Sequence, residues 1–206
     1  SLTGEDELYE AIFRQTGVIR AASFQELFDM ARVFSREPLM AGPRVCVVTV
    51  SGSLGVMTAD VCTAWGLELP DLSPETVCAL RDIAPSWMNV KNPLDLGPSG
   101  IYDAAIKAAL ADPRIDGIIA VPVIPEIVMQ KYTELGVDVG SMFGDPKEWR
   151  RLAPGKPILM FTLGGASWCE HVRKVYGADL SLVSSPENAA RALSASRRYG
   201  RFRAGG

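Results

Sequence analysis

The stretch Val45-Cys46-Val47-Val48-Thr49-Val50-Ser51-Gly52-Ser53-Leu54-Gly55 decides the fold. It joins a continuous apolar run to a short turn rich in glycine and serine, and residues 56–64 then follow with helical character. A strand without alternating polar residues is typical of a parallel sheet buried on both faces. The stretch therefore predicts a β-strand, a tight turn and a helix, which is the repeating unit of doubly wound α/β domains.

Four further apolar segments repeat this pattern downstream, each separated from the next by a segment with helical character. They predict strands at residues 67–69, 118–121, 158–162 and 180–183. Strands that alternate with helices favour one mainly parallel sheet covered on both faces. We therefore expect a three-layer, doubly wound α/β fold of the flavodoxin-like or Rossmann-like kind, with ligands at the carboxyl ends of the strands.

The first forty residues have a different organisation. Leu8, Ile12 and Phe13 recur at helical spacing, and residues 18–21 read as a short strand. Ser23 then predicts the N-cap of a second helix, with Glu26 three residues later completing a capping box. Proline and glycine interrupt the chain at residues 37–43. We therefore expect a helix-strand-helix connecting segment at residues 1–41 and the α/β domain at residues 42–206.

Composition excludes several classes of protein. A chain of 206 residues, 48% of them hydrophobic and 22% charged, is ordinary for a globular domain and excludes intrinsic disorder. The net charge of -3 argues against nucleic acid as a partner, and no apolar run approaches the ~20 residues needed to span a bilayer. The start is acidic and polar, unlike a signal peptide, and has no initiator Met, which indicates a processed chain or an excised fragment.

Four cysteines are present, and their spacing does not match a metal site. We interpret Cys46, Cys62, Cys78 and Cys169 as reduced and buried, because each lies in an apolar periodic segment. Reduced thiols are typical of the cytoplasm. The expected localisation is therefore cytoplasmic, with no metal ligands.

The turn after the first strand predicts an anion site. Gly52 and Gly55 allow the backbone to approach a ligand closely, and the helix that follows offers free N–H groups and the positive end of its dipole. This combination favours phosphate. Ser51, Gly52, Ser53, Leu54 and Gly55 are therefore the candidate phosphate-binding residues, and the two serine hydroxyls are additional donors.

Two other interpretations of this turn remain open. It is compatible with a tight strand-to-helix turn that binds nothing. Alternatively, Ser51-x-Ser53-x-Gly55 is similar to a nucleophile elbow with its first glycine replaced, which would make Ser53 the nucleophile of a serine hydrolase. The chain has one histidine, His171, as a possible base, but it falls in the middle of a predicted helix.

A second informative stretch is Lys91-Asn92-Pro93-Leu94-Asp95-Leu96-Gly97, within a loop predicted over residues 87–100. A residue before proline is extended, and Asn92 and Asp95 have side chains that can hold neighbouring amides. The stretch is either a purely structural turn or a loop whose Asn92 and Asp95 support the phosphate-binding turn.

The order of several motifs resembles that of one family, the NDP-forming acyl-CoA synthetases of the succinyl-CoA ligase superfamily, which includes ADP-forming acetyl-CoA synthetase. The resemblance extends over nearly the whole chain. The matching segments are residues 3–20, residues 23–34, Gly52–Gly55, Asn92-Pro93-Leu94-Asp95, Gly164-Gly165 and residues 185–193. Each motif is weak alone, and their ordered set is more specific.

The resemblance implies a C-terminal flavodoxin-like ligase domain and a reaction. Acyl-CoA, phosphate and NDP would interconvert with acid, CoA and NTP, with magnesium accompanying the nucleotide and no tightly bound cofactor. A phosphohistidine carries the phosphoryl group to an ATP-grasp domain and is stabilised by two helix N-termini. The turn at Ser51–Gly55 would supply one of these N-termini.

The resemblance also implies missing parts. The family's histidine lies in a Ser-His-Thr-Gly stretch, and Ser1-Leu2-Thr3-Gly4 matches the residues that follow this stretch, so the phosphohistidine would lie upstream of Ser1. No catalytic residue is therefore expected in this chain. The CoA-binding, phosphohistidine and ATP-grasp domains would be partners, on the same polypeptide or in another subunit. An alternative is a non-catalytic regulatory or CoA-binding module, as in acetyltransferase fusions of the family. The acid substrate, the nucleotide preference and the oligomeric state are not determined by the sequence.

Overall fold

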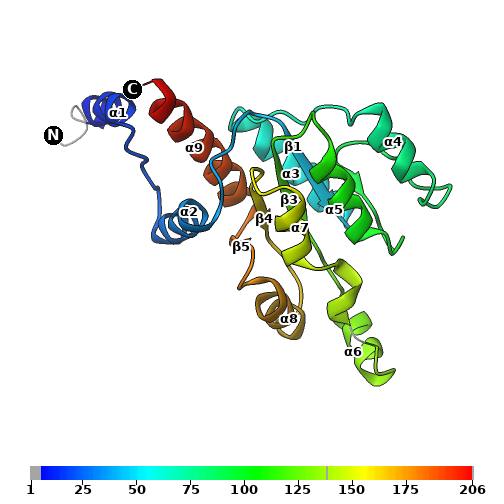
Figure 1. Ribbon diagram of the computed structural model, residues 1–206. Helices are drawn as coiled ribbons and strands as arrows, with labels where there is room; N and C mark the ends of the chain where they lie inside the picture. Colours follow the sequence, from blue (N-terminus) through cyan, green and yellow to red (C-terminus); the bar gives the residue numbers. More distant parts are fainter. Residues whose placement is uncertain (1–5, 138, 206) are drawn as a thin grey trace.

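The computed structural model describes residues 6–137 and 139–205, and its centre is a five-stranded parallel sheet (Figure 1). The strands are β1 (Val45–Thr49), β2 (Leu94–Asp95), β3 (Gly117–Val121), β4 (Ile158–Met160) and β5 (Ser181–Leu182). Their order in space is β2-β1-β3-β4-β5, and every neighbouring pair is parallel. This order confirms the predicted doubly wound, flavodoxin-like α/β fold, with its topological switch point between β1 and β3.

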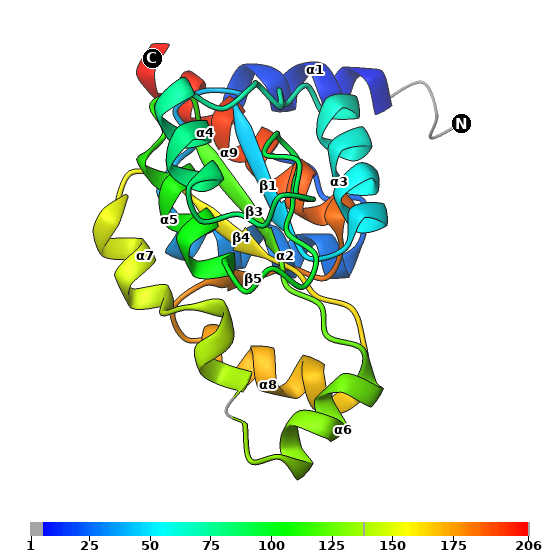
Figure 2. The ribbon, with the colours of Figure 1, turned by 90° about the vertical axis from the view of Figure 1, so that its right-hand side faces the viewer.

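Helices cover both faces of the sheet. The helices of the described residues are α1 (Asp6–Thr16), α2 (Phe24–Arg36), α3 (Gly52–Ala64), α4 (Pro74–Arg81), α5 (Tyr102–Ala111), α6 (Glu126–Glu134), α7 (Pro146–Leu152), α8 (Ala166–Tyr176) and α9 (Pro186–Gly205), with a short 3-10 helix, η1 (Val139–Phe143). Helices α2, α3 and α9 lie on one face, and α4, α5 and α7 lie on the other (Figure 1). Helices α6 and α8 pack against each other beyond the carboxyl ends of β3 and β4 (Figure 2).

Strand β1 explains why the sheet is covered on both sides. All five of its residues are buried. Val45 and Val47 belong to the apolar cluster under α2 and α9, whereas Cys46 and Val48 belong to the cluster under α4 and α5. Because successive side chains point to opposite faces, a strand with two buried faces needs apolar residues throughout.

Two of the predicted strands are wrong. Residues 67–69 form only a single bridge, between Glu68 and Arg44, and residues 18–21 are not a strand. The fifth strand is instead β2, which falls inside the segment predicted as a loop. Leu94 and Asp95 pair with Val48 and Thr49 of β1 at the edge of the sheet. A strand of two residues beside a proline is too short to leave a periodic pattern.

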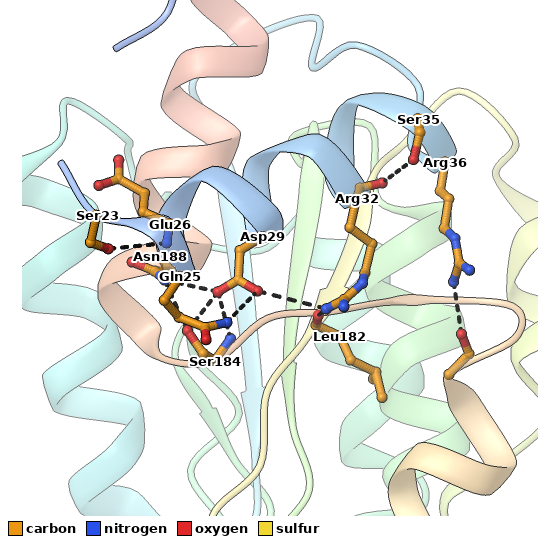
Figure 3. Close-up of polar contacts among 11 residues, drawn as sticks. Ser23, Gln25, Glu26, Asp29, Arg32, Ser35, Arg36, Leu182, Ser184 and Asn188 are labelled. Atoms are coloured by element: carbon orange, nitrogen blue, oxygen red, sulfur yellow. Dashed lines mark hydrogen bonds and ion pairs between the residues drawn. The ribbon is translucent and has the colours of Figure 1, made fainter. Parts of the chain in front are cut away.

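Helix α2 is fixed to the α/β domain by a buried carboxylate. Its predicted N-cap is confirmed, because Ser23 Oγ accepts a hydrogen bond from the Glu26 amide at 3.1 Å. One turn later, Asp29 Oδ2 accepts hydrogen bonds from the Ser184 amide at 2.9 Å and from Asn188 Nδ2 at 2.8 Å (Figure 3). Ser184 lies just before α9 and Asn188 lies in its first turn, so Asp29 ties α2 to the start of that helix.

A second buried carboxylate ties the segment after α2 to the sheet. Glu37 forms a bidentate ion pair with Arg150 of α7. Its two carboxylate oxygens also accept hydrogen bonds from the amides of Ile158 in β4, at 2.9 Å, and Ser181 in β5, at 3.2 Å. The proposed domain boundary after residue 41 remains a prediction, and α2 and Glu37 contact the α/β domain directly.

The cysteines differ from one another in exposure. Cys46 and Cys62 are buried free thiols, as predicted. Cys78 is exposed on α4 and Cys169 is partly exposed on α8, so the prediction that all four are buried is wrong. Both lie on helices with one solvent-facing side, where an apolar residue type does not guarantee burial.

Candidate functional site

The predicted phosphate-binding turn lies where β1 passes into α3. Ser51 is the N-cap, with extended φ and ψ of -136° and 110°, but its side chain does not cap the helix. Thr49 holds the turn instead, because its hydroxyl accepts from the Ser51 amide at 3.0 Å and donates to the Ser51 carbonyl at 3.1 Å. The same carbonyl accepts from the Gly55 amide at 3.0 Å, which closes the first turn of α3.

Three backbone donors at the start of α3 are left without partners. Among the described residues, the amides of Gly52, Ser53 and Leu54 have no hydrogen-bond acceptor. The hydroxyl oxygens of Ser51 and Ser53 lie 3.2 Å apart beside them. Unpaired amides at a helix N-terminus, next to the positive end of the dipole, form an arrangement that accepts an anion.

The two glycines of the turn lie in close contact with other parts of the chain. Neither has a positive φ. A Cβ atom at Gly55 would lie 3.0 Å from Thr49 Cγ2, and one at Gly52 would lie 2.7 Å from Asp95 Oδ2. Their small size therefore allows α3 to start directly against β1 and β2.

The structure places Asp95 at the turn and Asn92 farther back. Asp95 pairs with Thr49, and its Oδ1 accepts a hydrogen bond from the Gly97 amide at 3.2 Å, while Oδ2 faces Gly52. Asn92, which precedes a cis peptide bond to Pro93, bonds to the edge of β1: its Oδ1 accepts from the Val47 amide at 3.1 Å and its Nδ2 donates to the Val45 carbonyl at 2.8 Å. Asn92 thus fixes the strand, whereas Asp95 contributes charge beside the turn.

The geometry gives no support to the serine hydrolase interpretation. Ser53 lies in the first turn of α3, and no described residue other than glycine has a positive φ, so the strained backbone of a nucleophile elbow is missing. The hydroxyl of Ser53 pairs with Ser51. His171 lies on α8, where its ring stacks on Trp168 with centroids 5.7 Å apart.

A cavity that the sequence did not predict opens at the switch point, next to the turn. Its volume is about 360 Å³. Its walls are Val50, the loop Leu96–Gly100, Tyr102, the segment Val123–Pro125, Val128, Tyr132, Met142 and Phe143. The signal for it in the sequence is weak: Val50, Leu96 and Val123 are apolar residues that follow strands, at positions where polar loop residues are common.

Two residues of the cavity wall, Tyr102 and Phe143, belong to an aromatic cluster. Tyr102 and Phe143 meet edge to face with centroids 4.9 Å apart, and Phe143 contacts Trp168 at 5.4 Å. The Tyr102 hydroxyl donates to the Val48 carbonyl at 3.2 Å. Burial raises the pKa of Tyr102 well above its usual value, so the phenol stays neutral.

Over residues 6–137 and 139–205, no three His, Cys, Asp or Glu side chains are grouped so that they could hold a metal ion. In the same ranges, no helix has the length and apolar character needed to cross a bilayer.

Family models match two consecutive parts of the chain. The model described as a succinyl-CoA ligase like flavodoxin domain matches residues 1–34, and that described as a Ligase-CoA domain matches residues 45–142. The second match begins with β1 and includes the turn, Asp95 and part of the cavity. The two models occur in the order that the sequence motifs predicted.

Relatives of known identity match the same region. The alpha subunit of acetate–CoA ligase [ADP-forming] II from Pyrococcus furiosus is 36% identical over 168 residues, which cover 80% of this chain and 35% of the relative. The alpha subunit of isoenzyme I from the same organism is 31% identical over 216 residues, which cover 99% of this chain and 43% of the relative. This chain therefore spans less than half of the length of these relatives.

Solved structures of similar proteins have the same fold over nearly all of this chain. A crystal structure of PH0766 from Pyrococcus horikoshii OT3 is 30% identical, with a TM-score of 0.81, and the match covers 97% of this chain and 45% of that one. The apo acetyl-coenzyme A synthetase 1 of Ca. Korarchaeum cryptofilum, at 24% identity and a TM-score of 0.79, has the same fold over 96% of this chain. The two family models and the acetate–CoA ligase relatives place this chain in the succinyl-CoA ligase superfamily, as a fragment that contains a Ligase-CoA domain and resembles part of the NDP-forming acyl-CoA synthetases.

Proposed function

We propose that this chain is the part of an NDP-forming acyl-CoA synthetase that stabilises phosphate and phosphohistidine at the N-terminus of α3. The complete enzyme would interconvert acyl-CoA, NDP and phosphate with acid, CoA and NTP. The observation that carries the proposal is the set of three amides, at Gly52, Ser53 and Leu54, that have no acceptor among the described residues. They face the carboxyl edge of the sheet at the switch point, where ligands of such folds bind.

The proposed stabilisation of phosphate at the start of α3 is electrostatic. A phosphoryl group carries nearly two negative charges, and backbone amides with a helix dipole stabilise it without a permanent cation. The dipole contributes about 0.3–1 kcal/mol at an exposed site, and up to about 2 kcal/mol when the site is partly buried. Closing the site with a second domain would therefore strengthen it, because the amides would then be shielded from water.

Asp95 supports the turn and also competes with the anion. Its carboxylate lies against Gly52, where it stabilises the positive end of α3 in the absence of phosphate. A phosphoryl group at the same amides would be repelled by this carboxylate. We infer that Asp95 weakens simple anion binding at the turn, so that firm binding requires the remainder of the enzyme.

The family and the exposed surface of α1 support a proposal about the partners of this chain. Helix α1 buries none of its residues, and Leu8, Tyr9 and Ile12 are exposed. The family model for a flavodoxin domain ends on α2, so we propose that the remainder of such a domain covers α1 and supplies the phosphohistidine upstream of Ser1. CoA-binding and ATP-grasp domains would complete the enzyme, with CoA, phosphate and magnesium-bound ADP or ATP as substrates, in the cytoplasm.

The anion site is tested by titrating the isotopically labelled chain with inorganic phosphate at constant ionic strength. The largest amide shifts in the NMR spectrum are expected at Gly52, Ser53 and Leu54. The N-terminus of α5, at Tyr102 and Asp103, is the matched control, because it is another helix start without a side-chain cap. Equal shifts at both helix starts, or none at α3, would contradict the proposal.

The incompleteness of the chain is tested by a direct assay. The chain alone, supplied with acetate, CoA, ATP and magnesium, is expected to form no acyl-CoA, because the phosphohistidine and the nucleotide site belong to its partners. The protein encoded by the whole gene, together with any separate ATP-grasp subunit, is expected to form it. Robust acyl-CoA formation by the chain alone would refute the proposal.

A further inference from the structure

A second cleft lies between α1 and α9, away from the proposed phosphate site. Helix α1 lies beside the C-terminal part of α9 (Figure 1 and Figure 2), where a Cβ atom on Gly17 would lie 2.5 Å from Phe202 Cδ1. The cleft has a volume of about 240 Å³, and Trp65, which ends α3, forms part of its wall. Because α3 is 13 residues long, the cleft lies about 20 Å from the turn at its N-terminus.

The lining of this cleft is strongly basic. Arg14 and Arg20 reach it from α1 and the residues just after α1, and Arg191 and Arg198 reach it from α9. Glu10 is the only acidic residue that the described part of the chain places in the lining. The chain as a whole carries a net charge of -3. An excess of positive charge in one cleft of an acidic chain favours an anionic ligand.

Two of the four arginines are already paired with carboxylates. Arg20 Nη1 lies 2.8 Å from Asp6 Oδ1 and 3.0 Å from Glu10 Oε1. Arg191 Nη1 lies 2.8 Å from the buried Glu26 Oε2. These contacts hold both guanidinium groups in place and compensate much of their charge within the chain.

The other two arginines are unpaired. Arg14 and Arg198 are exposed, and neither forms an ion pair or a hydrogen bond with any described residue. Guanidinium groups bind phosphate oxygens in a bidentate manner. Two of them together match the charge of about -1.5 to -2 that a phosphate monoester carries at pH 7. Arg14 and Arg198 are therefore suited to a phosphate monoester placed between α1 and α9.

Aromatic side chains form a further part of the lining. Trp65 is 43% exposed, and Phe13 is partly buried. The guanidinium of Arg191 lies over the Trp65 ring, with Cζ 4.5 Å from the ring centroid. Nucleic acid bases stack on aromatic rings and on arginine planes. Trp65 and Arg191 thus form a flat platform for a base, in the same cleft as the two unpaired arginines.

We propose that this cleft binds a nucleoside monophosphate, with its phosphate between Arg14 and Arg198 and its base against Trp65. The volume is below the ~300–1,000 Å³ of typical small-molecule pockets, which limits the ligand to one small nucleotide. The ligand joins α1, in the segment matched by the flavodoxin-domain model, to α9. The inference is independent of the proposed function, because the phosphate of that reaction binds at the other end of α3.

Binding is tested by NMR titration of the labelled chain with AMP at constant ionic strength. Saturable shifts are expected at the amides of Phe13, Arg14 and Arg198 and at the indole N–H of Trp65. Adenosine lacks the phosphate and ribose 5-phosphate lacks the base, so each is expected to bind about tenfold more weakly or worse. Shifts that do not saturate, or that are confined to Gly52–Leu54, would overturn the inference, as would adenosine binding as tightly as AMP.

Matched variants assign the contacts. Arg198→Gln should weaken AMP binding about tenfold, whereas Arg203→Gln, at an exposed position farther along α9, should leave it unchanged. Trp65→Leu should weaken the binding of AMP but not that of ribose 5-phosphate, and Trp87→Leu, exposed and outside the cleft, is its control. Arg14→Gln repeats the first test from α1, in case Arg198→Gln does not fold. If both arginine variants bind AMP as tightly as the native chain, the inference is wrong.

The protein encoded by the whole gene provides a second readout. AMP is expected to slow hydrogen exchange in residues 6–20 and 191–203, and this protection should be lost in Arg198→Gln. CoA also carries a phosphate monoester on a nucleoside, so it is tested in parallel. Protection of the same residues by CoA and not by AMP would identify CoA as the source of the nucleotide. Protection by neither ligand would overturn the inference, whether or not the protein forms acyl-CoA.

Discussion

Gly52 and Asp95 are in such close contact that a methyl group on Gly52 would lie 2.7 Å from Asp95 Oδ2. The first residue of α3 and the last residue of β2 thus bring a carboxylate to the positive end of a helix whose first amides are unpaired. The contact determines both how α3 starts and how strongly the turn attracts an anion. The charge of Asp95 leads to a prediction about anion binding, and the small size of Gly52 leads to a prediction about stability.

Replacing the carboxylate is expected to strengthen anion binding. Asp95→Asn keeps an oxygen that can accept from the Gly97 amide but removes the negative charge beside Gly52. The affinity of the chain for inorganic phosphate should rise about two- to fivefold, which corresponds to the ~0.3–1 kcal/mol of a charge at an exposed helix terminus. An NMR titration with inorganic phosphate measures this affinity. Asp60→Asn, exposed on a later turn of α3, is the control, and unchanged or weaker binding by Asp95→Asn would disprove the repulsion.

Enlarging the glycine is expected to destabilise the turn through Asp95. Gly52→Ala forces the carboxylate of Asp95 to move, and because this is the end of an exposed side chain the cost lies at the low end of the about 1–3 kcal/mol that crowding causes in a packed core. Urea unfolding should therefore show a lower midpoint for Gly52→Ala. In an Asp95→Ala background the same substitution should cost much less, because the atom that it meets is gone. Equal losses in both backgrounds would show that the steric contact is unimportant.

Glu37 is expected to be among the costliest charges to remove. Glu37→Gln leaves Arg150 without its charged partner and disturbs the bonds to Ile158 and Ser181. Breaking a buried pair in this way lowers the free energy of unfolding by about 3–5 kcal/mol. The exposed pair of Glu170 and Arg173 provides the control, since Glu170→Gln should be nearly neutral. Equilibrium unfolding in urea distinguishes the two variants, and similar midpoints would contradict the prediction.

Asp112 is expected to make stability depend on pH. Burial by itself raises the pKa of Asp112, but hydrogen bonds from the amides of Ser73 and Arg114 outweigh it, so the pKa lies below its usual value. The carboxylate therefore adds stability above the unfolded pKa of about 3.9, and this stability is lost as the pH falls through the lower folded value. Asp112→Asn should cost about 1–3 kcal/mol at pH 7.

The pH dependence of that cost is the decisive measurement. The difference in unfolding free energy between the native chain and Asp112→Asn should shrink as the pH falls below about 3.9. Asp71→Asn, at an exposed position before α4, should show no such trend. If the difference in unfolding free energy stays constant down to acid pH, the cost of Asp112→Asn comes from a change in side-chain shape and not from the loss of charge.

The thiols are expected to react in the order of their exposure. Cys78 should react first with Ellman's reagent, and Cys169 next. Burial raises the pKa of Cys62 to about 12 and that of Cys46 as well, so neither forms a thiolate near neutral pH. Mass spectrometry after partial labelling identifies the modified residues, and early labelling of Cys46 would contradict the buried position of β1.

The sequence predicted the elements whose residues are contiguous. Val45–Thr49 is apolar at every position, so its burial on both faces and the helix that follows were readable in advance. Strand β2 was missed because Leu94 and Asp95 are only two residues, and their pairing depends on Asn92, which bonds to β1 from outside the strand. Sequence patterns within a few residues carry little information about a two-residue strand at the edge of a sheet.

The candidate site was predictable only in part, for a related reason. The turn at Ser51–Gly55 is one segment, and its free amides follow from helix geometry. The cavity next to it combines Val50, Ser99 and Val123, which come from three loops that the parallel topology brings together. The role of Gly52 was also hidden, because the side chain that it accommodates, Asp95, lies more than forty residues away.

Helix α2 has a practical consequence for any attempt to divide this protein. The family model for the flavodoxin domain ends on α2, which would assign this helix to the preceding domain. However, Asp29 on α2 bonds to the start of α9, and Glu37 just after α2 bonds to β4 and β5. A truncated version starting at residue 42 would expose the apolar residues on which Met30 and Val33 pack. It would also remove Glu37, the ion-pair partner of Arg150. Engineers who wish to exchange or fuse such modules should therefore place the junction ahead of Ser23, in the extended stretch between α1 and α2.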